Sequence, residues 1–408
     1  MWLHLKLAIR NIFRNKRRTF IAGSAIGIGL AALIFSDALI IGMGNNMIAS
    51  ATESFMGEGQ IHREGFRTSF DVEKTIVNRK QIISKLKEES VVKHFTERVE
   101  SFAMITSPAN LSSVMMVGVS PDTETHLSQI DEAITEGSYF SEGGKRQIII
   151  GSKLAEILEV SLGDRVVLTT AQAHTGDLAQ EMFRISGIYH FNIKEMDRGM
   201  AFIRLSKAQE MLGIDGNIHE IALRFNNSSI GRNQDHPFWQ EYSGDVNDAA
   251  SWSKLMPELN LMLEVSQFAT YILGIILFGV VALGIINTLF MSLHERLFEF
   301  GVMRAVGTSA FQMGRLVFFE AGALAFISII IGCIAGLIVT YIVMQTGIDY
   351  TGIEVSGVTF RHLLYPVLKV DQFIIYPSAV LILTLITGLY PSIYAAKMSP
   401  AEAMRRSL

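Results

Sequence analysis

Four long apolar stretches constrain the fold of this chain more than any other feature. Each has about 20 or more mostly apolar residues, enough for an α-helix to cross the roughly 30 Å of hydrocarbon in a bilayer. Charged residues make up 18% of the chain, against about 25% in an average soluble protein. We therefore predict four transmembrane helices, at residues 19–43, 267–293, 316–344 and 372–395.

Basic residues near the predicted helix ends orient the chain, because cytoplasmic segments of membrane proteins are enriched in Lys and Arg. Residues 1–18 carry six basic residues and no acidic one, and further basic residues follow the fourth helix. We predict three cytoplasmic segments: a basic N-terminal helix (1–18), a segment between the second and third helices (294–315) and a tail (396–408). The segments predicted to lie outside are 44–266 and 345–371.

The N-terminus also permits a second interpretation, a cleaved signal peptide, because Ala49-Ser50-Ala51 resembles a cleavage site. The apolar region of a signal peptide usually has about 7–15 residues. The first apolar stretch is longer than that, which favours an uncleaved membrane anchor.

The outer segment 44–266 has the composition of a soluble domain with mixed helix and strand signals. Residues 146–150 and 219–225 read as strands, and 80–89 reads as an amphipathic helix. Residues 205–213 predict a short helix that begins at Ser206 and stops at Gly213. We expect an α+β domain with two subdomains, joined directly to the first and second membrane helices.

Few signals for chemistry are present. The segment Glu142–Arg146 (EGGKR) lacks the first Gly of a phosphate-binding loop, and no Ser or Thr follows its Lys. No Ser-His-Asp order, nucleophile elbow or carboxylate pair stands out. The ten His residues have no metal-ligand spacing, and the single Cys333 cannot form a disulfide within the chain. We predict no catalytic residue, no metal site, no bound cofactor and, from the net charge of −4, no nucleic-acid partner.

The inner segment 294–315 is longer than a link between two helices requires, since such links commonly have about 2–8 residues. One interpretation is a helical extension with solvated charges. The other is an apolar knob that docks into a cytoplasmic protein, because an exposed apolar patch usually marks an interface. Thr308 or Ser309 is expected to cap the helix that follows. The knob residues are Phe298, Phe300, Val302, Met303, Ala305 and Val306.

Two acidic residues fall inside predicted membrane helices. Asp37 lies late in the first helix and is either a functional intramembrane acid or a hydrated interfacial one. Glu320, one turn into the third predicted helix, is expected to complement the positive end of the helix dipole.

The inner segment, in the sequence ERLFEFGVMRAVGTSAFQMGRLVFFEA (295–321), resembles the signature of the FtsX/MacB-like ABC permease superfamily. The C-terminal YPSIYAAKMSPAEAMR resembles the closing motif of that family, and LAIRNIFRNKRRTFIAG its opening motif. From the outer segment, VGVSPDTE and GSKLAEILEVSLGDRVVL also resemble the family, and GEGQIHREGF resembles a stretch common in its lipoprotein-releasing (LolC/LolE-type) members, to which the chain is most similar. The resemblance covers nearly the whole chain.

The resemblance implies a four-helix permease of the bacterial inner membrane, with a periplasmic domain of porter and sabre subdomains and both termini in the cytoplasm. Two permeases, either identical or paralogous, pair in the lipid membrane. Each carries a cytoplasmic ABC ATPase subunit that binds the ATP and Mg, and hydrolysis moves the outer domains. By matching positions, the resemblance assigns ATPase coupling to Glu299, Phe300, Gly301, Met303, Arg304, Ala305, Val306, Gly307, Pro400, Ala401, Glu402 and Ala403.

Three functions remain open at this stage. The first is release of lipoproteins from the inner membrane to a periplasmic carrier, although the hairpin Thr169–Met182 is shorter than the carrier-binding hook of that group and lacks its proline. The second is export of drugs, peptides or toxins with a periplasmic adaptor. The third is regulation of a cell-wall hydrolase across the membrane.

Overall fold

The computed structural model describes Arg10 and residues 16–141, 144–244, 246–350, 354–355, 358–359 and 363–397. The predicted segments 1–18 and 396–408 therefore lie mostly outside the described residues. The chain divides into two compact units. The first comprises Met1–Gly44, Glu264–Asp349 and Leu364–Leu408, and the second Asn45–Leu263 and Tyr350–Leu363.

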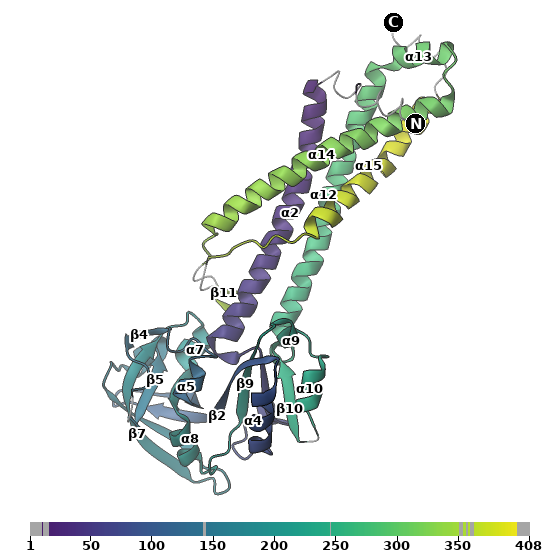
Figure 1. Ribbon diagram of the computed structural model, residues 1–408. Helices are drawn as coiled ribbons and strands as arrows, with labels where there is room; N and C mark the ends of the chain where they lie inside the picture. The colour runs from purple at the N-terminus through teal and green to yellow at the C-terminus, as the bar shows by residue number, and fades with distance from the viewer. Residues whose placement is uncertain are drawn as a thin grey trace. The chain divides into compact units, whose positions relative to one another are not determined.

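Four helices in the described part of the chain are long and apolar enough to cross a membrane, as predicted (Figure 1). At a rise of 1.5 Å per residue, the first two are each longer than about 50 Å and exceed the hydrocarbon thickness of roughly 30 Å. The boundary between the two units falls inside both of them. The four helices are α2 (Lys16–Ala51), α12 (Pro257–Glu295), α14 (Ala310–Thr346) and α15 (Gln372–Lys397).

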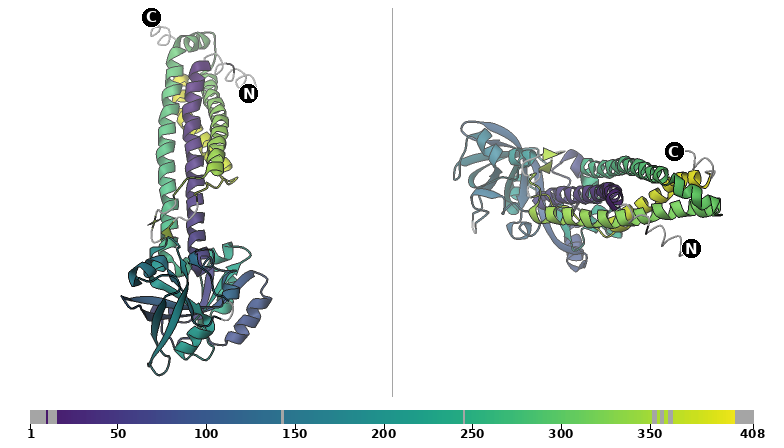
Figure 2. Two further views of the ribbon diagram at one scale, coloured as in Figure 1. Left: turned by 90° about the vertical axis from the view of Figure 1, so that its left-hand side faces the viewer. Right: turned by 90° about the horizontal axis from the view of Figure 1, so that it is seen from above.

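Apolar side chains from all four helices form the core of the first unit. Leu30 and Ile34 of α2 are fully buried there, together with Ile285 of α12 and Val380 of α15. Helices α14 and α15 lie side by side, as both views in Figure 2 show. Because lipid is as apolar as these side chains, close packing rather than water exclusion holds such helices together.

Helices α2 and α14 approach closely through glycines. A Cβ on Gly332 would lie 2.8 Å from the Gly27 carbonyl oxygen, and one on Gly27 would lie 3.2 Å from the Gly332 nitrogen. The two helix backbones are therefore in close contact at these glycines. A Cβ on Gly279 or Gly284 of α12, in contrast, meets no atom within 4 Å.

Asp37 is bonded to another membrane helix within the first unit. The Gln372 side chain, at the start of α15, donates a 2.8 Å hydrogen bond to an Asp37 carboxylate oxygen. The Val367 backbone N–H, just before α15, donates to the carbonyl of Ala38. These bonds join the outer half of α2 to the start of α15. Asp37 therefore has a structural role in joining the two helices, whether it is a functional intramembrane acid or a hydrated interfacial one.

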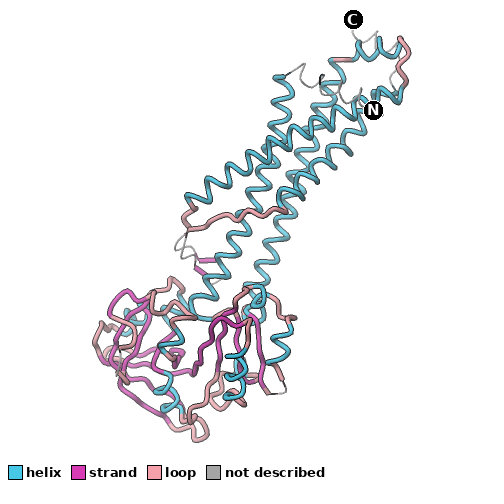
Figure 3. The backbone as a smooth tube through the Cα atoms, viewed as in Figure 1, coloured by secondary structure: helices cyan, strands magenta, loops and turns pink. Residues whose placement is uncertain are grey.

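The second unit is built on a sheet of ten strands among its described residues (Figure 3, magenta). The strand order is β10-β1-β9-β2-β3-β8-β5-β7-β4, and β6 pairs with both β2 and β7. The strands are β1 (Gly59–Arg63), β2 (Val92–Thr106), β3 (Leu111–Val119), β4 (Ile134–Gly137), β5 (Gln147–Gly151), β6 (Arg165–Ala171), β7 (Leu178–Tyr189), β8 (Met200–Arg204), β9 (Glu220–Phe225) and β10 (Asn247–Ser251).

The pairing of β6 closes six of these strands into a ring, β2-β3-β8-β5-β7-β6. Strand β2 is long enough to serve two groups of strands. Its first half pairs with β9, and its second half pairs with β3 and β6. Strands β9, β1 and β10 extend from the ring on the β2 side, which places the start of the domain, at β1, beside its end, at β10.

Short helices cover this sheet, and the predicted elements are present as helix and strand. The helices are α3 (Phe66–Ser69), α4 (Arg79–Glu88), α5 (Pro121–Glu124), α6 (Ser152–Leu158), α7 (Lys194–Gly199), α8 (Leu205–Leu212), α9 (Ser229–Arg232), α10 (Pro237–Tyr242) and α11 (Trp252–Leu255). Helix α8 ends at Gly213 in the left-handed conformation, as expected, but the predicted cap at Ser206 is wrong. Arg204 precedes the helix without a side-chain cap.

Candidate coupling site

The coupling segment, residues 294–315, is a short helix set between two long ones. Helix α12 ends at Glu295, α13 runs from Leu297 to Ala305, and α14 begins at Ala310. Hydrogen bonds hold the end of α13 on both sides of Gly307, whose φ of 109° suits glycine. The Gly307 N–H donates to Arg304, and the Thr308 N–H donates to Met303. This pair of bonds is a Schellman motif.

The start of α14 is fixed just as firmly. The Ser309 side chain accepts a bond from the Gln312 N–H, and the Gln312 side chain accepts one from the Ser309 N–H. This reciprocal capping box satisfies two backbone donors that the first turn of a helix leaves open. It confirms Ser309, the second of the two predicted caps. Only Gly307 and Thr308 lie between Val306, the C-cap of α13, and Ser309, the N-cap of α14, so the turn is tightly defined.

The apolar knob divides into an inner and an outer face. Phe300 is only 2% exposed and packs with Leu293, Met313 and Val317. The adjacent Gly301 is also buried. Three other residues point outward with a spacing of four, so they share one face of the helix. Phe298 is 53% exposed, Val302 40% and Val306 83%. We call these three residues the outer stripe.

An arginine joins α13 to α14. One guanidinium nitrogen of Arg296 lies 2.6 Å from a Glu320 carboxylate oxygen, and another lies 3.0 Å from Glu299. The guanidinium also lies 4.9 Å from the centre of the Phe300 ring. Burial lowers the pKa of Arg296, but the carboxylates of Glu320 and Glu299 more than offset it, so the net pKa is raised. Arg296 therefore stays charged.

This ion pair corrects the role expected for Glu320. Helix α14 begins at Ala310, so Glu320 lies almost three turns inside the helix. The dipole effect is confined to the first turn, and the charge of Glu320 is balanced by Arg296 instead. The sequence did not predict this pair, because Arg296 and Glu320 are 24 residues apart and lie in different elements.

The structure places the predicted coupling residues in three different environments. Ala305, Val306 and Gly307 are exposed, whereas Glu299, Met303 and Arg304 are partly buried. Phe300 and Gly301 face inward, so they shape the turn rather than its surface. The outer stripe adds Phe298 and Val302, which the sequence analysis counted in the knob without assigning them a contact. The second predicted contact, Pro400, Ala401, Glu402 and Ala403, lies outside the described residues.

Ser152, His190 and Asp197 lie together in the second unit, but their geometry is not that of a catalytic triad. The Ser152 hydroxyl lies 2.8 Å from the Nδ1 atom of His190, and an Asp197 oxygen lies 3.2 Å from the same nitrogen. A triad needs the serine and the acid on opposite ring nitrogens. Here the second nitrogen, Nε2, is bonded to Asn192. Among the described residues, no group of three or more His, Cys, Asp or Glu could hold a metal ion.

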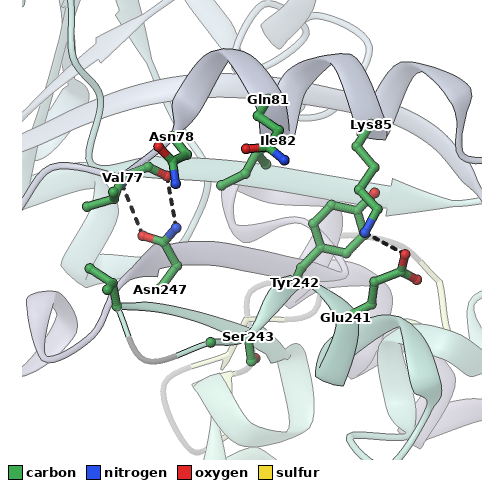
Figure 4. A pocket seen from close by; sticks show the side chains of 11 residues that line it. Val77, Asn78, Gln81, Ile82, Lys85, Glu241, Tyr242, Ser243 and Asn247 are labelled. Atoms are coloured by element: carbon green, nitrogen blue, oxygen red, sulfur yellow. Dashed lines mark hydrogen bonds and ion pairs between the residues drawn. The ribbon is translucent and has the colours of Figure 1, made fainter.

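A cavity of about 280 Å³ opens between α4 and the segment that joins α10 to β10 (Figure 4). The Asn247 side chain crosses it and forms hydrogen bonds with both the N–H and the carbonyl of Val77. Lys85 and Glu241 form an ion pair of 2.5 Å at the other end. Asn247, Lys85 and Glu241 are thus bonded within the fold, whereas the Tyr242 hydroxyl in the cavity wall has no hydrogen-bond partner among the described residues.

Two family profiles match the chain over both units. The profile of the FtsX-like permease C-terminal domain matches residues 271–400. The profile of the MacB-like periplasmic core domain matches residues 19–230, which is more than half of the 408 residues. The first match contains the coupling segment, and the second contains most of the ten-stranded sheet.

Individual relatives are similar at low identity. The lipoprotein-releasing system transmembrane protein LolC of Xylella fastidiosa is 23% identical over 326 residues, 75% of this chain and 76% of LolC. LolE of Haemophilus influenzae, named for the same system, is 23% identical over 398 residues, 93% of each chain. The ABC transporter permease YtrF of Bacillus subtilis is 28% identical over 151 residues, 35% of this chain and 34% of YtrF.

Proposed function

This chain belongs to the FtsX/MacB-like family of ABC transporter permeases, and from that premise we propose that it couples a separate cytoplasmic ABC ATPase to its periplasmic domain. In this proposal the ATPase binds ATP and Mg, closes on nucleotide, and displaces the coupling segment. The displacement passes along α2 and α12, which lead into and out of the periplasmic domain. The resulting movement releases lipoproteins from the bacterial inner membrane.

The outer stripe is the observation that supports this proposal most directly. Phe298, Val302 and Val306 expose apolar side chains on a turn that a Schellman motif and a capping box hold in place. An apolar surface on a preorganised element suits docking, because little conformational freedom is lost on binding. The orientation predicted from basic residues puts this turn in the cytoplasm, where an ATPase subunit is available.

The coupling residues then have two roles. Val306, with Ala305 and Gly307 beside it, forms the contact surface together with the rest of the outer stripe. Phe300 and Gly301 anchor the turn against the helix core, and Arg296 holds α13 to α14. The assignment of Pro400, Ala401, Glu402 and Ala403 as a second contact stays part of the proposal, as does a second permease, identical or paralogous, in the same complex.

Lipoproteins are the proposed substrate because LolC and LolE, which match 75% and 93% of this chain, are named for lipoprotein release. The hairpin of β6 and β7 is compact, and its loop is closed by a 2.8 Å bond from the Gln172 N–H to Asp177. A periplasmic carrier that received the lipoprotein would have to bind without a long hook at this position.

Substitution of Val306 tests the docking assignment. We expect Val306→Glu to abolish co-purification of the ATPase, since a charge would be desolvated in an apolar contact. Val306→Leu keeps the apolar surface and serves as the matched control. Because Val306 is 83% exposed, neither change should affect insertion into the membrane. Normal recovery of the ATPase with Val306→Glu contradicts the assignment.

The substrate is tested separately with the purified complex of the permease and its ATPase. We expect it to retain an acylated lipoprotein and to release it on addition of Mg-ATP. The same protein without its acyl chains should not be retained. Equal retention of both forms argues against lipoprotein release and in favour of a different cargo or of a regulatory role.

A further inference from the structure

The first membrane helix changes its geometry where it meets the sheet. Helix α2 ends at Ala51 and continues as a π-helical turn, η1, over Thr52–Met56. Gly57 closes this turn with φ of 78°, and its N–H donates to the Thr52 carbonyl. Strand β1 begins only two residues later, at Gly59. Single π-helical turns are rare and are frequently found at functional sites.

Arg98 holds this turn from the centre of the sheet. It is 0% exposed, and one of its terminal nitrogens donates a 2.6 Å hydrogen bond to the Phe55 carbonyl. Its guanidinium also lies 3.8 Å from the centre of the Phe55 ring. Arg98 therefore contacts both the backbone and the side chain of the residue that leads from α2 into the domain.

Two carboxylates fix the orientation of the same guanidinium. Glu124 of α5 binds it through both oxygens, at 2.5 and 3.0 Å. Glu220 of β9 binds the remaining terminal nitrogen at 2.7 Å. Both Glu side chains are also 0% exposed. We call Arg98, Glu124, Glu220 and Phe55 the Arg98 cluster.

The position of Arg98 in the sheet matters as much as its bonds. Along β2 it is the residue that pairs with Val119 of β3 on one side and with Glu220 of β9 on the other. It therefore lies where β2 passes from one group of strands to the other. A force applied at Phe55 through this side chain reaches both groups of strands at their junction.

Stability alone is a poor explanation for such a cluster. Burying charged groups removes their hydration, and well-packed apolar residues of the same volume often stabilise a fold equally well or better. The charged groups also fix the orientation of the contact, because a planar guanidinium bonded at several nitrogens sets angles as well as distances. The base of α12 shows the apolar alternative, since Trp252 of α11 is 1% exposed and lies directly before that helix.

We propose that Arg98 is a positioning residue that transfers displacement of the first membrane helix to the periplasmic sheet. Its fixed contacts with η1, α5 and β9 make the sheet follow movement of Phe55, rather than allowing the turn to slip across it. The inference rests on the proposed function in one respect, which is that ATP displaces the helices.

The test measures the movement of the periplasmic domain in the complete complex. Spin labels are placed at the exposed positions Lys87, in α4, and Gln345, near the end of α14, after Cys333→Ser has removed the only cysteine. The distance between the labels is measured by pulsed electron resonance, in nanodiscs that hold the permease and its ATPase. Samples without nucleotide are compared with samples trapped by Mg-ATP and vanadate.

Three variants separate transfer of movement from folding. Arg98→Met leaves the buried carboxylates of Glu124 and Glu220 without their guanidinium. It is therefore compared with a triple variant, Arg98→Met with Glu124→Gln and Glu220→Gln, in which all three charges are removed. Phe55→Leu keeps every ion pair and removes only the ring. The control is Phe191→Leu, a buried aromatic residue of the same apolar cluster as Phe55, whose ring lies 5.3 Å from that of Tyr189.

We expect the nucleotide-dependent distance change to be lost in the triple variant, reduced in Phe55→Leu and unchanged in Phe191→Leu. ATPase co-purification and hydrolysis rate should stay within twofold of the parent protein, which a general loss of structure would not permit. A full distance change in the triple variant or in Phe55→Leu overturns the inference. A parent complex without any distance change overturns the proposed function, and the inference with it.

Discussion

Two arginines of this permease have closely similar surroundings in different units. Arg98 in the periplasmic sheet and Arg296 in the coupling segment are each bound by two glutamates and each lie over a phenylalanine ring. The first stands where α2 leads into the domain, and the second where α12 turns into α13. Both are points at which a long helix meets a different element.

The two clusters differ in burial and in the origin of their partners. The partners of Arg98 are Glu124 and Glu220, 26 and 122 residues away, and all three side chains are 0% exposed. The partners of Arg296 are only 3 and 24 residues away, and the Glu299 side chain is 43% exposed. The outer cluster therefore depends on the whole domain fold, whereas the inner one is formed by two neighbouring helices.

This difference indicates different tasks for the same set of side chains. A fully buried cluster without water to compete for its bonds holds one geometry, which suits a rigid connection. A cluster with one solvated partner exchanges its bonds at smaller cost, so the Arg296 cluster constrains its surroundings less than the Arg98 cluster does. The following predictions separate the two clusters by experiment.

The largest expected effect is on the stability of the periplasmic domain. Arg98→Met should lower the free energy of unfolding by about 3–5 kcal/mol, because it leaves buried carboxylates without a counter-charge. Urea unfolding of the full chain, followed by tryptophan fluorescence, measures this, since Trp239 and Trp252 lie in this domain. The triple variant with Glu124→Gln and Glu220→Gln should recover most of the loss. An equal loss in both variants contradicts the charge argument.

Replacement of the inner arginine should have a smaller effect, and in a different assay. Arg296→Met is expected to weaken ATPase binding about tenfold to a hundredfold, because a hydrogen bond to a charged group contributes about 1.5–3 kcal/mol. Urea unfolding of the periplasmic domain should not change.

A double-mutant cycle tests whether the inner pair acts as a unit. Because Glu320 acts through Arg296, the double variant Arg296→Met with Glu320→Gln should bind the ATPase no more weakly than Arg296→Met alone. Simple additivity of the two single effects would show that the residues act independently.

The smallest expected effect is a pH dependence confined to the outer cluster. Glu100 lies beside Glu220, and burial, followed by the Glu220 charge, raises its pKa to about 8, while Arg67 and Arg98 oppose the shift. Folding thus favours its protonated form, and this stabilisation is lost as the pH rises from about 4.5 through 8.

His62 and His219 change the stability in the opposite sense. Burial lowers the pKa of His62 to about 3 and also lowers that of His219, so their stabilisation is lost as the pH falls below 6.5.

Glu100, two residues after Arg98 on β2, is therefore expected to change its protonation between pH 6.5 and 8. The urea midpoint of tryptophan fluorescence should fall across that range, and Glu100→Gln should flatten the dependence. Glu88→Gln, at an exposed position of α4, is the control and should retain it. ATPase binding at the inner cluster should be constant, because Arg296 stays charged. An unchanged slope in Glu100→Gln contradicts the assignment.

Much of the fold could be predicted from local patterns. Apolar stretches of about 20 residues predicted the four helices, and residues 219–225 were predicted as the strand that the structure has as β9. The capping box at Ser309 and the left-handed stop at Gly213 follow from residue types that favour those positions. One error was also local, since Ser206 was predicted as a cap where Arg204 precedes the helix. The pairing of Glu320 with Arg296, 24 residues away, was not predicted.

The coupling site was predicted as a segment but not as a surface. The sequence analysis treated Phe298, Phe300 and Val302 as one knob, yet Phe300 points into the helix core and the other two point outward. A spacing of four residues between Phe298, Val302 and Val306 was the available signal. It could not show which face the rest of the chain covers, because that depends on Met313 and Val317 of the next helix.

The sequence alone determined that this chain spans a membrane four times and that its inner turn carries the permease signature. These properties are local, since hydropathy and motif spacing are summed over neighbouring residues. Only the tertiary structure decided which arginines are joined to which glutamates and where a helix is held to the sheet. The charge of Arg98 is balanced by Glu124 and Glu220, 26 and 122 residues away, and patterns among neighbouring residues do not show such pairings.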